Sequence, residues 1–182
     1  ILNDKDEQIP ISQADAKYKR YIGNGAPKHF LSWSNNLTWR NFDLSVFFRG
    51  TFGFDVFNMR KYGMGLQGCG TDNVLRSAYL EDKNIRTGGG VISSYFLEDG
   101  SFIKLENVTL GYNFTPKNRK LLDNMRIYLS AKNLFTLTGY SGNDPSIIDV
   151  NGIQPGVDSN SAYPTATQLS LGVTLRFKIG RA

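Results

Sequence analysis

The chain has 182 residues, enough for one domain with its own core, and a formal net charge of +5 at pH 7. It holds no run of about 18 or more apolar residues, which excludes a transmembrane helix but not a membrane barrel, whose strands alternate. Aromatic residues make up 13% of the chain and 19 residues are glycine, a composition that favours an all-β protein with long loops.

The first residues, ILNDKDEQIP, are acidic and polar. They lack the basic and apolar regions of a signal peptide. We therefore expect that a further part of the protein precedes them.

Alternating polarity predicts five strands, each with one apolar and one polar face. In the closing strand every odd residue from Leu169 to Phe177 is apolar, and every even residue is polar or glycine. A tight turn at Arg40-Asn41 separates the first two strands. The five predicted strands are Leu31–Trp39, Phe42–Phe52, Ser101–Phe114, Met125–Leu137 and Leu169–Phe177.

The third predicted strand contains a conflict, because Lys104 and Glu106 have the same parity as its apolar residues. In the interpretation that we prefer, the strand crosses a membrane and Lys104 lies near the top of the apolar band, where a charge costs little. In the alternative, a β-bulge changes which side chains point to the apolar side.

Short and long connections alternate along the chain. Arg40-Asn41 and residues 115–124 are short, whereas residues 53–100 and 139–164 are long and rich in Gly, Asn, Asp and Ser. Outer-membrane barrels have short periplasmic turns and long external loops, so we expect the closing strand to end on the periplasmic side. Residues 71–82, inside the first long loop, predict a short helix.

The predicted strands are longer than the about 5–6 residues usual in soluble sheets. Aromatic residues also gather near the strand ends that would lie on the periplasmic side, as an interfacial girdle requires. These features favour an all-β fold, an antiparallel transmembrane β-barrel segment, over a soluble carbohydrate-binding β-sandwich, whose strands alternate too. The aromatic residues are Trp39, Phe42, Tyr112, Phe114 and Phe177.

No motif indicates an enzyme, and no cofactor or metal site is predicted. P-loop, GxSxG and HExxH sequences are absent, and Cys69 and His29 are single. Asp144 precedes a proline and is explained by turn chemistry. The basic residues Lys117, Arg119, Lys120 and Arg126 are interpreted as a solvated turn and not as a nucleic-acid surface.

Several stretches resemble SusC-like, TonB-dependent outer-membrane transporters. SSYFLEDGSFIKLENVTLGYNF is similar to the family's LEDGSFLRLKN run followed by TLGY, and MRIYLSAKNLFTLTGYSGNDP is similar to its next block, with NLFT and GxDP. IGNGAPKHF, NFDLS and the following FG resemble the family's strand entry, and PGVD with AYP completes the order. The resemblance extends over about residues 21–177.

The resemblance implies that the chain is the C-terminal barrel portion of such a transporter, whose 22-stranded barrel encloses a plug. It implies residues 1–27 as an extracellular loop and strand entry, residues 28–177 as barrel strands with long loops at 53–100 and 139–164, and residues 178–182 as a periplasmic tail. The acidic family stretch before IG is altered, since LNDKDEQI has Glu7 at the turn glycine. A solvated loop is therefore expected there and not a bound calcium ion.

The implied function is TonB-dependent import of oligosaccharides or oligopeptides across the outer membrane of a Gram-negative bacterium. The implied partners are a SusD-like surface lipoprotein, TonB, outer-membrane lipid and a glycan or peptide ligand. A siderophore or cobalamin receptor of the TonB-dependent class is the alternative within the membrane, and the soluble β-sandwich is the alternative outside it.

Three sets of candidate site residues follow. The closing strand resembles the terminal assembly signal of outer-membrane proteins at Ser170, Gly172, Leu175 and Phe177. Polar residues that should face the lumen are Asp43, Arg49, Tyr128, Lys132 and Arg176. External aromatic residues that are candidates for stacking on a glycan or contacting a partner are Tyr95, Tyr140 and Tyr163, although loop packing or partner contact is preferred to a glycan contact.

Overall fold

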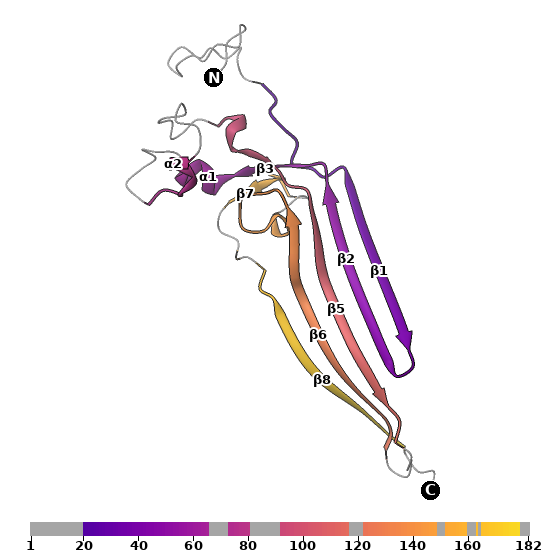
Figure 1. Cartoon of the computed structure of the whole chain (residues 1–182). Helices are drawn as coiled ribbons and strands as arrows, with labels where there is room; N and C mark the ends of the chain where they lie inside the picture. Colours follow the sequence, from indigo (N-terminus) through magenta and orange to yellow (C-terminus); the bar gives the residue numbers. More distant parts are fainter. Residues whose placement is uncertain are drawn as a thin grey trace, which may run out of the picture.

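The structure is a computed structural model that describes residues 20–65, 73–80, 92–116, 122–148, 152–159, 163 and 165–178. Its largest element is a five-stranded sheet of order β1-β2-β5-β6-β8, in which every neighbouring pair is antiparallel. The long strands lie side by side over most of their length (Figure 1). They are β1 (His29–Trp39), β2 (Phe42–Phe52), β5 (Phe102–Phe114), β6 (Leu122–Thr138) and β8 (Gln168–Phe177).

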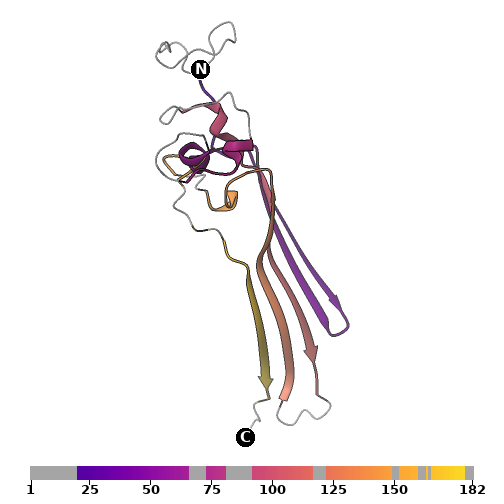
Figure 2. The same cartoon turned by 60° about the vertical axis from the view of Figure 1, so that its left-hand side comes forward.

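A second, three-stranded sheet of order β4-β3-β7 gathers with the short helices at one end of the long strands (Figures 1 and 2). We call this the loop end, and the opposite end, where Arg40-Asn41 joins β1 to β2, the turn end. Among the described residues no helix has the length and hydropathy needed to cross a membrane. The short elements are β3 (Asp55–Asn58), α1 (Met59–Met64), α2 (Ser77–Leu80), η3 (Ser94–Phe96), β4 (Leu97–Asp99), η4 (Pro145–Ile147) and β7 (Val157–Asp158).

The five strands predicted from alternation are confirmed, with ends that differ by at most a few residues. The tight turn between the first two is confirmed as well, because Trp39 and Phe42 are paired directly across it. Helix α2 lies within the stretch 71–82 that predicted one. The three-stranded sheet was not predicted, since strands of two to four residues contain too few positions to show a period.

One face of the five-stranded sheet is apolar and the other is polar. Directly opposed residues of neighbouring strands point to the same side, so the register assigns each side chain to a face. A row of leucines crosses all five strands on the apolar face, and nothing in the described part of the chain covers it. The row consists of Leu37, Leu44, Leu110, Leu129 and Leu171.

The conflict in β5 is resolved by a bulge. Against β2, the register shifts beside Glu106, so that Leu105 lies opposite Phe48 on the apolar face. Lys104 lies opposite Arg49 on the polar face. The interpretation that placed Lys104 high on the apolar face is therefore wrong, and the bulge alternative is correct, because one extra residue inverts the parity of the strand beyond it.

The main buried apolar cluster lies at the loop end. Phe102 has the same parity as Lys104 in β5 and so belongs to the polar side of the sheet. The short β3 strand and the chain after β6 pack over it there. The polar face is thus covered at the loop end, while the residues that the structure describes leave the apolar face uncovered. The cluster consists of Phe54, Val56, Phe102, Tyr140 and Ile148.

Candidate functional site

Sequence motifs that lie far apart along the chain meet at the loop end. The backbone N–H of Asp55 donates to the carbonyl of Asn24 (2.8 Å), and the N–H of Phe57 donates to the carbonyl of Gly156 (2.8 Å). IGNG, FDVFN and PGVD are joined in this way by main-chain hydrogen bonds. We call the segments 23–25, 54–58, 97–102, 138–148 and 155–158 together the loop platform.

Glycines allow these segments to approach one another. Gly156 has a φ of 74°, a conformation that residues with a Cβ rarely adopt. A Cβ on Gly25 would overlap the carbonyl of Pro155, and one on Gly100 would overlap the ring of Phe54. The glycines of three motifs are therefore required by the close packing of the platform.

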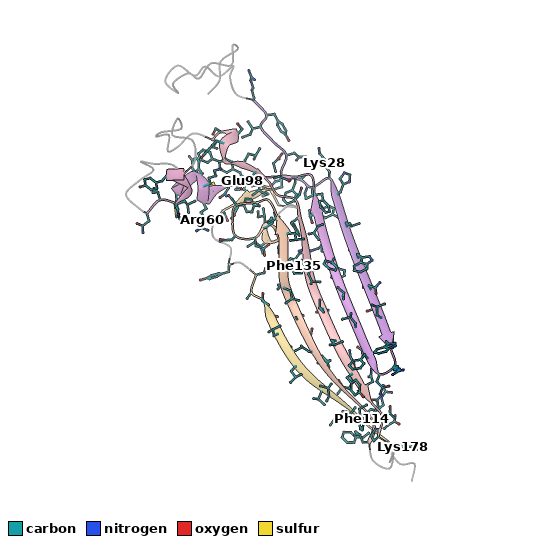
Figure 3. All side chains as sticks on the ribbon, in the orientation of Figure 1. Lys28, Arg60, Glu98, Phe114, Phe135 and Lys178 are labelled. Carbon is teal, nitrogen blue, oxygen red and sulfur yellow. The ribbon has the colours of Figure 1, made fainter. Side chains whose placement is uncertain are left out.

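Glu98 ties the two long loops together. Its carboxylate accepts hydrogen bonds from the backbone N–H and the hydroxyl of Ser141, both at 2.8 Å. It also accepts one from the side-chain amide of Asn58 (3.3 Å), which in turn caps helix α1 by accepting from the N–H of Lys61. Glu98 and Arg60 lie at the loop end, far from Phe114 at the turn end (Figure 3).

A buried ion pair fastens the platform to the sheet. Lys104 is 2% exposed, and its Nζ donates to Asp144 (3.1 Å), Ser146 (2.7 Å) and Thr165 (2.8 Å). Burial raises the pKa of Asp144, but hydrogen bonds from Thr165, Ser146 and Lys104 outweigh it and hold the pKa below its usual value. Strand β5, helix η4 and the approach to β8 are thus joined at one charged centre.

The three candidate tyrosines lie in different surroundings. Tyr140 is 6% exposed and its hydroxyl donates to Asp158 (2.6 Å). Burial, together with this hydrogen bond, raises its pKa well above the ordinary value. Loop packing therefore describes Tyr140 in this structure. Tyr95 is half-buried with the Nζ of Lys61 4.4 Å from its ring centroid, and Tyr163 is 93% exposed; ligand or partner contact stays a prediction for both.

The polar face carries a second cluster toward the turn end. Arg126 donates to Asp43 through two nitrogens, at 2.5 and 3.1 Å, and Asn113 donates to the same carboxylate at 2.8 Å. Gly111 lies opposite Asp43, and a Cβ there would collide with the carboxylate and with Arg126. Strands β2, β5 and β6 are linked across the polar face by this arrangement.

The same cluster extends to the closing strand. Tyr128 lies opposite Gly172, and a Cβ on Gly172 would overlap the tyrosine ring. The guanidinium carbon of Arg126 lies 5.1 Å from the centroid of that ring. We call the group of six residues that spans β2, β5, β6 and β8 the polar clasp: Asp43, Gly111, Asn113, Arg126, Tyr128 and Gly172.

The remaining lumen candidates also have polar-face positions. Arg49 pairs with Glu106 at the bulge (2.5 Å). Lys132 and Arg176 are exposed opposite Gln168 and Asn124. Whether this face lines a lumen stays a prediction.

The assembly-signal candidates divide between the two faces. Ser170 and Gly172 lie on the polar face, while Leu175 and Phe177 lie on the apolar face opposite Met125 and Leu122. Their predicted role in assembly is not tested by this arrangement.

Sequence reasoning missed the partners that matter most in both clusters. It explained Asp144 by turn chemistry, which the N–H of Ser146 donating to its carboxylate confirms, but it missed Lys104 as a partner. It assigned Arg126 to a solvated turn, which is wrong because Arg126 lies in β6 and pairs with Asp43, and it did not single out Glu98. Parity did place Arg126 and Asp43 on the same polar face, although strand β5 lies between their strands. Nothing local could pair Lys104 with Asp144, which lies 40 residues further along the chain.

Within the described residues no three His, Cys, Asp or Glu side chains are grouped in a way that could hold a metal ion. The acidic stretch with Glu7, the single Cys69 and three of the four basic residues, Lys117, Arg119 and Lys120, lie outside the described residues.

An open antiparallel sheet with one bare apolar face, a polar face and loops gathered at one end defines a segment of a transmembrane β-barrel wall. Structural comparison agrees with this class. The RagAB peptide transporter matches with a TM-score of 0.71 and 23% identity over 96% of this chain and 20% of its own. The RagAB peptide importer in its closed-closed state gives 0.70 and 22% over the same shares. The predicted fold is confirmed, as a section of wall that does not close by itself.

Sequence comparison leads to named relatives. TonB-dependent receptor P3 of Formosa agariphila is 28% identical over 97% of this chain and 19% of its own length. TonB-dependent receptor SusC of Bacteroides thetaiotaomicron is 28% identical over 79% of this chain and 14% of its own length. No family model matches the chain.

The predicted resemblance to SusC-like, TonB-dependent receptors is confirmed by these homologues. The homologues are receptors and transporters and not enzymes. The chain spans about a fifth of the length of the curated relatives that it matches.

Proposed function

We propose that this chain is a section of the barrel wall of a TonB-dependent outer-membrane transporter, together with the platform that anchors its external loops. The observation that carries the proposal is the division of the five-stranded sheet into two unlike faces. Side chains such as Leu171, 75% exposed, have no cover within the described chain, whereas the other face holds the charged clasp. Lipid on one side and water or a plug on the other satisfies both faces.

The position of the small sheet on the large one disfavours the soluble β-sandwich. In a sandwich the apolar face of one sheet packs against the apolar face of another, about 10 Å away. Here the small sheet packs over the polar side of the large one, near Phe102, and leaves the leucine row bare. A second sheet on the apolar face would have to come from elsewhere in the protein.

The proposed cargo is an oligosaccharide or an oligopeptide, taken up with a SusD-like lipoprotein that docks at the loop end. Similarity to SusC and to the RagAB peptide importer supports this over the siderophore or cobalamin alternative. Energy would come from TonB through parts of the protein outside this chain. The exposed Tyr163 and the partly exposed Tyr95 are the candidates for contact with cargo or partner.

The proposal is tested with the full-length protein in its native bacterium. Deletion of the gene should abolish growth on one oligosaccharide or oligopeptide pool while growth on the monomers continues, and deletion of tonB should reproduce the defect. Loss of growth on ferric siderophores or cobalamin alone would favour the alternative receptor. Unchanged growth of the deletion strain on every pool would refute import.

A separate measurement addresses the membrane. We expect the full-length protein in the outer-membrane fraction. On gels the unheated protein should migrate differently from the heated protein, as is general for folded barrels. A protein that is monodisperse in buffer without detergent and keeps a native β-sheet circular dichroism signal would exclude the barrel and favour the soluble sandwich.

A further inference from the structure

The turn that joins β1 to β2 contains an arginine in an unusual conformation. Arg40 has a φ of 53°, in the left-handed region that glycine, asparagine or aspartate adopt most readily. It shares that region with one other non-glycine residue among those described, Asn133. A backbone conformation that disfavours arginine points to a use for the side chain.

The side chain of Arg40 is directed to an aromatic ring and not to an acid. Its Cζ lies 5.2 Å from the ring centroid of Trp39. The ion pairs of the described residues join Arg49, Lys61, Lys104 and Arg126 to carboxylates, and none of them includes Arg40. Its guanidinium is exposed and keeps its hydrogen-bonding capacity for a ligand from outside the described chain.

Trp39 begins an aromatic row at the turn end of the apolar face. The rings of Trp39 and Phe42 stack with centroids 6.5 Å apart, and those of Phe42 and Tyr112 lie 4.8 Å apart. Trp39 is 67% exposed. Tryptophan and tyrosine mark the level where hydrocarbon meets headgroups, since their rings have an apolar body and a polar tip. With this row at that level, the first residue beyond it, Arg40, would stand at the level of the phosphates.

We propose that Arg40 and Trp39 form a binding site for the phosphate of a phospholipid headgroup, in the leaflet that contacts the turn end of the barrel. This rests on the proposed function, because it requires the apolar face to lie in a bilayer. The guanidinium fork matches a phosphate in a bidentate manner. The Trp39 ring holds the fork in place by a cation–π contact and offers its other surface to the glycerol and upper acyl chain.

The apolar face identifies the occupant as a lipid and not a soluble anion. From Trp39 it continues without interruption to the leucine row at Leu37 and Leu44. An acyl chain attached to the bound phosphate would lie along that surface. Inorganic phosphate would gain the guanidinium contacts alone, without burial of any apolar area.

The closing experiment uses the full-length protein in detergent and two substitutions at one position. Arg40→Gly removes the side chain and relieves the left-handed backbone, while Arg40→Lys keeps the charge but loses the planar fork. Binding of phosphatidylglycerol is measured by native mass spectrometry, with inorganic phosphate as a second probe. Thermal unfolding of each variant is recorded in parallel.

We expect phosphatidylglycerol to bind Arg40→Gly about tenfold more weakly than the wild type, since a charge-assisted bidentate contact is lost. Arg40→Lys should lie between the two. Arg40→Gly should unfold at the wild-type temperature or above it, which separates the ligand role from a structural one.

Equal lipid binding by the wild type and Arg40→Gly would overturn the proposal. If inorganic phosphate displaced phosphatidylglycerol as well as unlabelled lipid does, the site would be a simple anion contact, and the proposal would be overturned as well. If either result is obtained while the protein is still found in the outer membrane and still imports cargo, the proposed function stands and only the lipid site is refuted. Recovery of the wild type in the soluble fraction would instead refute the proposed function itself.

Discussion

The leucine row and the loop platform are built on opposite principles. The row repeats one residue type at regular spacing and has no cover in the described chain, so the sheet that carries it depends on its surroundings for stability. The platform has no such repeat, and its members are held by contacts between residues tens of positions apart, such as Glu98 and Ser141. The leucine row therefore depends on the medium around it, whereas the platform depends on contacts among its own residues.

The difference also concerns what a substitution can do. On the sheet, a change acts through the medium that the side chain meets, and its effect depends on the face. In the platform, a change acts through a small number of named partners, and its effect depends on whether they are left unpaired.

The largest effect is expected from the closing strand. Deletion of residues 177–182 removes Phe177 and should deprive the outer membrane of most of the protein, because the apolar end of the terminal strand is proposed to engage the assembly machinery. Deletion of residues 178–182 alone should leave the level unchanged. Quantitative blotting of outer-membrane fractions decides it, and equal levels of the two variants would refute the assembly role.

The platform is tested at its buried charge. Lys104→Met leaves Asp144 buried without its counter-charge and should destabilise the platform by about 3–5 kcal/mol. Increased protease cleavage within residues 139–164 and a lower unfolding temperature of the full-length protein would report it. Lys132→Met, an exposed lysine of the same face, is the control and should change stability by less than about 0.5 kcal/mol.

A double substitution sharpens this result. Lys104→Met combined with Asp144→Leu removes both charges and should recover most of the loss, because an apolar pair does not carry the desolvation cost of an unpaired ion. No recovery in the double variant would mean that the hydrogen bonds to Ser146 and Thr165, and not the charge pair, hold the platform.

The two faces of the sheet can be distinguished with adjacent residues. Leu37→Arg places a charge in the leucine row and should cost about 2–4 kcal/mol if that row lies near the centre of a bilayer. Asn36→Arg, one residue away on the polar face and exposed, should cost less than about 0.5 kcal/mol. The amount of heat-resistant folded protein measures both, and equal effects would contradict a lipid-facing surface.

The smallest predicted effect concerns Gly172. Gly172→Val forces the ring of Tyr128 off the strand, and overpacking of this kind costs about 1–3 kcal/mol. A second change, Tyr128→Ala, should restore the folded level because it removes the overlapping ring. If the double variant stays as defective as the single one, the glycine is needed for assembly itself and not to make room for the ring of Tyr128.

The sheet could be predicted from sequence because each strand carries its own period. Leu169 to Phe177 alternates without exception, and the register then follows from the need to keep one face apolar. The bulge beside Glu106 could only be named as an alternative, since an extra residue changes parity without a characteristic sequence of its own. The same uncertainty led to the wrong position for Lys104.

The platform could not be derived in the same way. Its strands are two to four residues long, and its stability comes from pairs such as Glu98 with Ser141 that no local rule connects. Resemblance located the motifs, but it did not show that they contact one another. Tyr140 illustrates the consequence, because loop packing was preferred for it, yet nothing local indicated that its hydroxyl would donate to Asp158.

Asn58 and Glu98 lie near the two ends of the first long loop, and the side-chain amide of Asn58 donates to the carboxylate of Glu98 at 3.3 Å. Helix α1, which follows Asn58, is tied to the platform as well, because Arg60 donates to Asn143. The distance that this loop must span is therefore fixed by hydrogen bonds at its ends. A wall built in this manner offers a site for grafting new binding loops, in evolution and in the laboratory, without any revision of the barrel beneath it.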